Sequence, residues 1–108
     1  MSAVTTHVLD TALGRPAAGV PVRLFDGDGA LLARASTNSD GRVPSLGPDE
    51  LETGNYRLVL DTAAYFDSTG QTGFFPSVSI VFDLADPGQH YHVPLLLSPF
   101  AYSTYRGS

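Results

Sequence analysis

The chain has 108 residues, of which 43% are hydrophobic and 16% are charged, a composition typical of one small folded domain. It contains no cysteine and no lysine, which excludes disulfides, thiolate chemistry and a Schiff base on a lysine. Its net charge of −5, with six arginines and no lysine, argues against a nucleic-acid partner, because phosphate binding needs a basic surface.

Composition also predicts the location and assembly of the chain. No apolar run reaches membrane-spanning length, and the first residues lack the basic and then apolar pattern of a secretion signal. We therefore expect a single domain over residues 1–108, in the cytoplasm. The hydrophobic content is high for so short a chain, so part of the apolar surface is expected to lie between subunits.

The first half of the chain is predicted to form short strands joined by glycine-containing turns. Residues 26–29 and 38–41 carry glycines that tolerate a positive φ, as tight turns between strands require. Asp10, near the end of the first predicted strand, is expected to support a turn or to orient a neighbouring group. The strands are expected over residues 4–11, 20–25 and 31–37, and a further short strand is expected to start at residues 42–43.

The second half of the chain contains the one predicted helix, over residues 61–70. Asp61 can cap its start, Ala63 and Ala64 favour helix, and Gly70 can end it. Short strands around one short helix indicate an all-β fold, a β-sandwich. The strands of this half are expected over residues 55–60, 77–84, 91–97 and 101–105.

The strand predicted over residues 91–97 is apolar on both faces. His92, Pro94 and Leu96 share one face, and three aliphatic residues share the other. A two-layer sandwich buries only one face of each sheet, so we expect another copy of the chain to cover the second face. Pro94 lacks a backbone donor, which favours an edge position or an irregular pairing.

Four polar segments on distant parts of the chain stand out from this apolar background. They supply the imidazoles of His7 and His92, the guanidinium of Arg42, the phenol of Tyr105 and the hydroxyl of Ser108. These groups suffice for a hydrolytic site that uses neither a metal nor a covalent cofactor. The segments are residues 7–10, 37–42, 90–94 and 105–108.

In this order and spacing, the four segments resemble those of the transthyretin-related protein family, in its 5-hydroxyisourate hydrolase branch. The similarity extends over nearly the whole chain and includes Gly14-Arg15-Pro16-Ala17, Phe74-Phe75-Pro76 and Ser98-Pro99. The C-terminal Tyr105-Arg106-Gly107-Ser108 is the most specific part of the match. Any single segment is a weak signal, whereas the full set is strong.

The resemblance implies a transthyretin (prealbumin)-like β-sandwich of two four-stranded sheets with one short helix, assembled as a homotetramer without a cofactor. It implies active clefts at the dimer–dimer interface. The implied reaction is hydrolysis of 5-hydroxyisourate to 2-oxo-4-hydroxy-4-carboxy-5-ureidoimidazoline in urate breakdown. The implied catalytic residues are His7, Arg42, His92 and Ser108, with Tyr105 and Arg106 binding substrate.

Each of these residue types suits a step in opening a lactam. A neutral imidazole suits proton transfer near pH 7, so His92 is expected to activate water and His7 to handle protons or bind a substrate oxygen. The planar fork of Arg42 suits substrate clamping and oxyanion stabilisation. Ser108 can offer its hydroxyl or its terminal carboxylate, and Tyr105 can narrow a channel between subunits into a cleft.

Other interpretations of the same residues remain open at this point. His92 taken alone fits a core histidine bonded to the backbone, Arg42 a solvated turn residue, and the last four residues a frayed tail. His90 and His92 lie two residues apart and can ligate zinc together with His7, which would make a zinc hydrolase. The same sandwich can also serve as a small-ligand carrier without turnover, or as a purely structural module.

Overall fold

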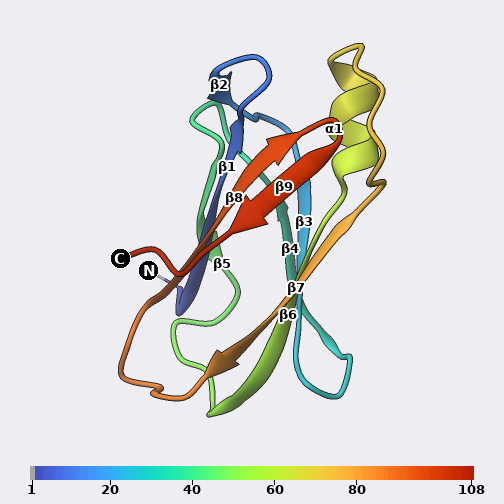
Figure 1. Cartoon of the computed structure of the whole chain (residues 1–108). Coiled ribbons are helices and arrows are strands. Elements are labelled where there is room, and N and C mark those ends of the chain that lie inside the picture. The colour runs from blue at the N-terminus through green and yellow to red at the C-terminus, as the bar shows by residue number, and fades with distance from the viewer. Residues whose placement is uncertain (1) are drawn as a thin grey trace.

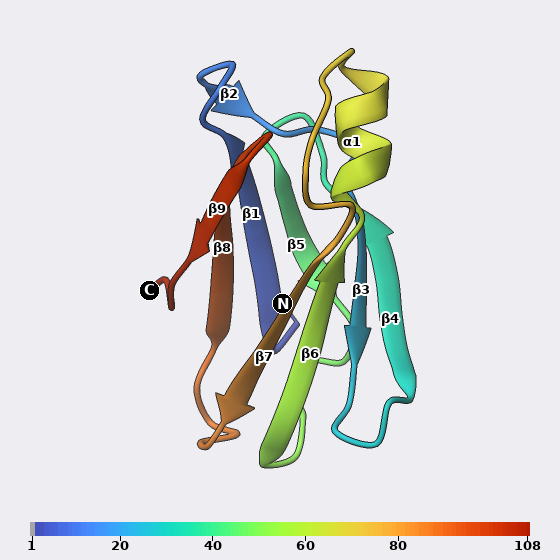
Figure 2. The ribbon, with the colours of Figure 1, turned by 45° about the vertical axis from the view of Figure 1, so that its right-hand side comes forward.

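The computed structural model describes residues 2–108, which form two β-sheets packed face to face with a helix at one end (Figure 1). Within this part of the chain, no helix is long and apolar enough to cross a bilayer. Figure 2 separates the two layers, with β1, β5, β8 and β9 on one side and β3, β4, β6 and β7 on the other. The elements are β1 (Val4–Asp10), β2 (Arg15–Pro16), β3 (Pro21–Phe25), β4 (Leu31–Ser36), β5 (Arg42–Leu46), β6 (Gly54–Leu60), α1 (Thr62–Ser68), β7 (Val78–Leu84), β8 (Tyr91–Ser98) and β9 (Ala101–Thr104).

The first sheet has the strand order β2-β1-β8-β9, and β5 also pairs with β1. β2 pairs with the end of β1 at Leu9 and Asp10, whereas β5 pairs with its start, between Val4 and His7. β1 and β8 run parallel in unbroken register. The second sheet is antiparallel throughout, in the order β4-β3-β6-β7. The structure therefore confirms the predicted all-β sandwich and adds the two-residue β2 to one of its four-stranded sheets.

The helix forms where its capping residue predicts it. Asp61 is the N-cap, and its side chain accepts a hydrogen bond from Ala64 N at 3.0 Å. The helix buries Tyr65 and Phe66 against the sandwich and ends at Ser68, two residues before Gly70, which has φ 68°. A left-handed residue at this position stops the helix, as glycine allows without steric cost.

β5 starts at Arg42, as predicted, and continues to Leu46. Val43 and Leu46 bury their side chains in the core, which holds the strand against β1 over five residues. Pro44 lies between them with its side chain exposed. Since β1 is the only strand that pairs with β5 among the described residues, proline can occupy this edge strand with little loss of ladder hydrogen bonds.

The core lies between the sheets and is almost entirely aliphatic. Alternate residues of the central strands point inward and are fully buried, as the period of two along a strand requires. Aromatic rings close the core near the start of β8, where Phe82 stacks between Tyr56 and Tyr91. The inward residues of the central strands include Val4, Val8, Val22, Leu24, Leu58, Leu60, Leu95 and Leu97.

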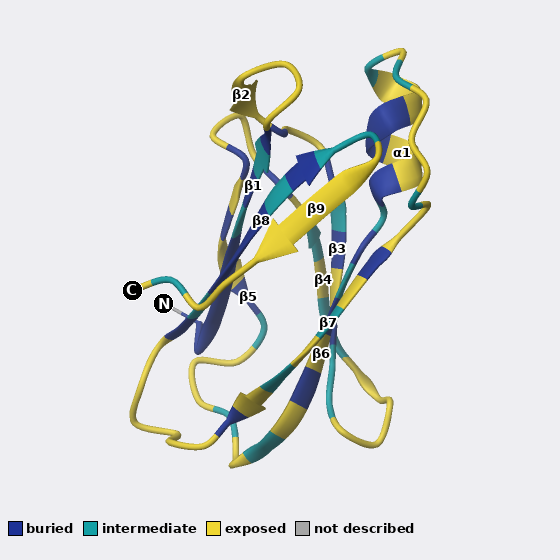
Figure 3. Cartoon of the chain, in the orientation of Figure 1, coloured by how far each residue is buried: buried dark blue, intermediate teal, exposed yellow. Residues whose placement is uncertain are grey.

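The chain's own C-terminus packs against part of the outer face of β8, the face that we expect a second copy to cover. Thr104 Oγ1 donates a hydrogen bond to Pro94 O at 2.7 Å, and Gly107 N donates one to His92 O at 2.8 Å. Pro94 is buried, whereas Leu96 on the same face is half-buried. Figure 3 shows β9 exposed along its length beside the buried and half-buried parts of β8.

β8 is also an interior strand, paired with β1 on one side and β9 on the other, so the edge position, the first of the two predicted alternatives, does not apply. The predicted irregular pairing is present. The ladder from β8 to the C-terminal segment runs from Ser98 to Leu95, is interrupted at Pro94 and resumes as an isolated bridge between His92 and Gly107. The missing donor of proline accounts for the interruption.

Candidate active site

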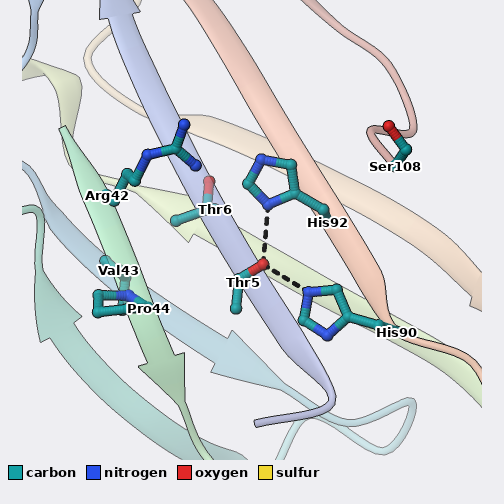
Figure 4. Close-up of a pocket in the computed structure, with 8 residues that line it drawn as sticks. All are labelled: Thr5, Thr6, Arg42, Val43, Pro44, His90, His92 and Ser108. Carbon is teal, nitrogen blue, oxygen red and sulfur yellow. Dashed lines mark hydrogen bonds between the residues drawn. The ribbon is translucent and has the colours of Figure 1, made fainter. Parts of the chain in front are cut away.

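A hollow on the outer face of the first sheet has a volume of about 290 Å³ and opens to solvent (Figure 4). Thr5 on β1 is the register partner of His92 on β8, and His7 on β1 is the partner of Arg42 on β5. Partnered side chains lie on the same face of a sheet, so this pairing collects four polar groups on one surface. The residues that line the hollow are Thr5, Thr6, Arg42, Val43, Pro44, His90, His92 and Ser108.

A tight turn delivers Arg42 to the hollow. Asn38 Oδ1 accepts hydrogen bonds from Asp40 N at 2.9 Å and from Arg42 N at 3.0 Å. Gly41 adopts φ 74°, and a Cβ atom there would lie 2.3 Å from Val8 O, so the turn requires glycine. Among the described residues, none forms a hydrogen bond or ion pair with the Arg42 guanidinium. Its five donors are available to a ligand.

The half-buried His92 imidazole presents one nitrogen to the hollow. Its Nδ1 lies 2.8 Å from Thr5 Oγ1, whereas no described residue hydrogen-bonds its Nε2. Figure 4 shows this second nitrogen on the side of the ring that faces Arg42. Burial lowers the pKa of His92, and the positive charge of Arg42 lowers it further. The imidazoles of His7 and His90 act in the same direction. The ring is therefore neutral at pH 7 and keeps a lone pair, as a general base requires.

Thr5 joins two histidines, and the sequence reasoning did not identify it. Its hydroxyl oxygen lies 2.8 Å from His92 Nδ1 and 2.8 Å from His90 Nε2 (Figure 4). The Thr5 side chain is buried, and His90 is exposed at the rim. The spacing of His90 and His92 predicts that they share a face. Only the parallel register of β1 with β8 reveals the threonine between them, and that register is a long-range property.

His7 lies beside the hollow and does not line it in the single chain. Its Nε2 is 2.9 Å from Asp40 O, and because a carbonyl only accepts, the ring nitrogen donates this hydrogen bond. The contact ties β1 to the turn that carries Arg42. His7 Nδ1 is then the nitrogen free to accept a proton.

The C-terminal residues divide between two hollows. Ser108 lines the first, together with Arg42 and His92. Tyr105 and Arg106 line a second hollow of about 250 Å³ between β7 and the C-terminal segment. Arg106 Nη2 donates a hydrogen bond to a Gln89 side-chain oxygen at 2.7 Å, and its guanidinium lies 4.4 Å from the Tyr91 ring centroid. The single chain therefore brings Arg42, His92 and Ser108 together and holds Tyr105 and Arg106 apart from them.

The arrangement does not favour the zinc interpretation. Across residues 2–108, no group of three or more histidine and carboxylate side chains is placed to hold a metal ion. His90 Nε2 and His92 Nδ1 both turn toward the Thr5 hydroxyl, and His7 Nε2 is bonded to a backbone carbonyl. The three rings do not converge on a common point, as zinc ligands must.

Several known proteins are similar to this chain over nearly its full length. The family model described as HIUase/Transthyretin family matches residues 4–107. "5-Hydroxyisourate hydrolase 2" of Rhizobium meliloti (strain 1021) is 51% identical, over 97% of this chain and 95% of its own length. Among solved structures, Klebsiella pneumoniae 5-hydroxyisourate hydrolase aligns with a TM-score of 0.89 and 39% identity, over 97% of this chain and 98% of its own. Transthyretin from Sparus aurata aligns with a TM-score of 0.91 and 32% identity, over 99% of this chain and 97% of its own. The chain belongs to the HIUase/transthyretin family.

Proposed function

We propose that this protein hydrolyses 5-hydroxyisourate, opening its lactam ring with water to give 2-oxo-4-hydroxy-4-carboxy-5-ureidoimidazoline. The observation that carries the proposal is the meeting of Arg42, His92 and Ser108, from three distant parts of the sequence, around one hollow. A volume of about 290 Å³ suits a small heterocycle. Relatives named for this activity align with this chain over nearly its full length.

The reaction follows from the charges of the site. His92 Nε2 takes a proton from water, and the oxygen of that water attacks the lactam carbonyl carbon. Negative charge develops on the carbonyl oxygen, where the unpaired guanidinium of Arg42 can stabilise it. The C–N bond then breaks, and the departing nitrogen receives the proton from His92. We assign Ser108, which also lines the hollow, to hydrogen bonding with the substrate.

We also propose that the working form is a homotetramer in the cytoplasm, in which a second copy completes each site. Apolar surface supports such an assembly. Leu9 and Leu96 are only half-buried on the face that bears the hollow, and Val81 on the edge strand β7 is 67% exposed. Tyr105 is 57% exposed and available to a partner copy. Analytical ultracentrifugation checks the assembly, and a monomer that retains full activity would contradict it.

The rival candidate is a ligand carrier, and the similarity to the Sparus aurata transthyretin favours it as far as the fold goes. Fold alone does not assign function, so the site must decide. A carrier binds its ligand without needing an unpaired guanidinium beside a neutral imidazole. The decay of freshly made 5-hydroxyisourate, followed by ultraviolet absorbance with and without the protein, separates turnover from binding.

The test uses Arg42→Ala with Arg34→Ala as a matched control. Arg34 is an exposed arginine on β4, in the other sheet. We expect Arg42→Ala to lose about 10²- to 10³-fold in kcat, as loss of an oxyanion partner does, and Arg34→Ala to match the wild type. Wild-type protein that binds the compound without speeding its decay would refute the hydrolase and favour the carrier.

A further inference from the structure

The hydroxyl of Thr5 cannot donate a hydrogen bond to both of its histidine neighbours at once. It has one proton to donate, and its oxygen lies 2.8 Å from His90 Nε2 and 2.8 Å from His92 Nδ1. One of the two hydrogen bonds must therefore be donated by a ring N–H. If Thr5 donates to His90, then His92 donates through Nδ1–H, and the reverse arrangement requires His90 to donate. The two tautomers are coupled through a single hydroxyl.

The surroundings of His92 select one of these arrangements. The Arg42 guanidinium contains only donors, and its positive charge favours a lone pair over a proton on the facing His92 Nε2. A neutral His92 then carries its proton on Nδ1 and donates it to Thr5 Oγ1. The hydroxyl in turn donates to His90 Nε2, and His90 carries its own proton on Nδ1. His90 is exposed, so this chain of hydrogen bonds runs from the hollow to the surface.

We propose that Thr5 and His90 complete a proton relay behind His92, an inference that rests on the hydrolase function proposed above. When His92 Nε2 takes a proton from water, its Nδ1 passes a proton to Thr5 Oγ1. Thr5 passes its own proton to His90 Nε2. His92 ends neutral, the hydroxyl keeps one proton, and His90 becomes an imidazolium. The reverse transfers return a proton through His92 Nε2 to the departing nitrogen, so no net proton is gained or lost.

The relay moves a positive charge from His92 to a more favourable position. A cation on His92 would be half-buried and would face the positive charge of Arg42 on β5, and both burial and that charge disfavour it. Moving the charge to His90 places it at the exposed rim, where water solvates it. Arg106 Nη2 donates a hydrogen bond to the backbone carbonyl oxygen of His90 at 3.5 Å.

Thr5 is a positioning residue in this account, and Thr5→Val against Thr5→Ser tests it. Valine keeps the shape and removes the hydroxyl, whereas serine keeps the hydroxyl. We expect Thr5→Val to lower kcat at least about 10-fold with KM within about twofold, and to shift the acid limb of the kcat/KM profile. Thr5→Ser should restore both the rate and the profile. Wild-type kcat and an unmoved profile in Thr5→Val would overturn the proposal.

His90→Gln separates proton transfer from mere orientation of the His92 ring. The glutamine oxygen can still accept from Thr5 and cannot take up a proton at neutral pH. We expect ¹⁵N NMR to show His92 protonated on Nδ1 in both the wild type and His90→Gln, while kcat falls at least about 10-fold in the variant. Wild-type kcat in His90→Gln, or a wild-type His92 protonated on Nε2, would refute the relay.

The NMR measurement uses the substrate-free protein, so it is independent of the proposed reaction. If the wild-type protein fails to hydrolyse 5-hydroxyisourate, the proposed function falls, while the coupled tautomers are still measured. If the wild type is active and both variants match it, the relay alone falls. The two failures are therefore distinguishable.

Discussion

The two ends of β1 each bury a polar side chain, and the two are used differently. Asp10 is 1% exposed, and Thr5 is 7% exposed. Asp10 Oδ1 accepts from Leu13 N at 2.8 Å, and Oδ2 accepts from the Tyr65 hydroxyl at 2.6 Å and from Gln71 Nε2 at 3.1 Å. The donor of each of these hydrogen bonds is another group of the protein. The Asp10 network ties β1 to α1 and supports the turn after the strand, as the sequence predicted.

The Thr5 network is open where the Asp10 network is closed. Its hydrogen bonds join Nδ1 of His92, whose Nε2 faces the hollow, and Nε2 of the exposed His90 ring. A buried polar group with every partner inside the protein adds stability and specificity to the fold. A buried polar group whose hydrogen bonds lead to the free lone pair of His92 Nε2, beside the unpaired guanidinium of Arg42, can take part in proton transfer. This difference, rather than burial or residue type, separates the site from the scaffold.

The largest expected effects come from removing the side chain of His92 and, separately, that of Asp10. His92→Ala should lower kcat/KM by about 10²- to 10⁴-fold and leave the unfolding free energy nearly unchanged. Asp10→Ala leaves the Tyr65 hydroxyl and the Gln71 amide without their acceptor, and should lower the unfolding free energy by about 2–3 kcal/mol. Its kcat/KM per folded molecule should match the wild type. Denaturation and kinetics at one protein concentration check both, and an inactive but folded Asp10→Ala would contradict the comparison.

A smaller effect is expected where the C-terminal segment passes close to His92. A Cβ atom at Gly107 would lie 2.6 Å from His92 Cδ2 and 3.2 Å from Pro94 Cγ, so either the segment or the ring must shift. We expect Gly107→Ala to lower kcat about 10-fold by displacing His92 and Ser108. Ser103→Ala, an exposed change on β9, serves as the control. Steady-state kinetics decides, and equal rates in the two variants would show that the close approach is unimportant.

The titration of His92 should differ from that of a free histidine in a defined direction. Its pKa is lowered by burial and by Arg42, so NMR titration should place its midpoint below 6.5, and Arg42→Gln should raise the midpoint. Activity should persist as pH falls to 6.5 and decline below it. The unfolded chain binds this proton more readily, so the fold loses stability as pH drops from 6.5 to the lowered value. A midpoint at or above 6.5 would contradict the assignment.

The smallest expected effect concerns the contribution of Asp10 to the stability of the fold in acid. Burial alone would raise the pKa of Asp10, but hydrogen bonds from Tyr65, Leu13, Gln71 and Ala12 outweigh it, and the pKa lies below 3.8. The ionised carboxylate therefore stabilises the fold above this value, and the contribution is lost as pH falls through the lowered pKa. The stability gap between wild type and Asp10→Asn should close in this acid range. Urea denaturation against pH measures it, and a gap that stays constant would contradict the prediction.

Local sequence signals predicted most of the architecture. Alternating apolar residues located the strands, glycines located the turns, and Asp61 located the start of the helix, because each signal acts between residues close along the chain. The resemblance also singled out Arg42, His92 and Ser108, which the fold places around one hollow.

Only the tertiary structure decided how distant groups pair. The parallel register of β1 with β8 placed Thr5 between two histidines, and the C-terminal segment was brought against Pro94. The fold also directed Arg106 toward Gln89, into a hollow separate from that of His92. Strand register and chain crossings depend on packing between segments far apart in sequence, where a shift of one residue reverses every side chain. Residue types and local patterns therefore determined what chemistry is available, and long-range packing determined which groups meet.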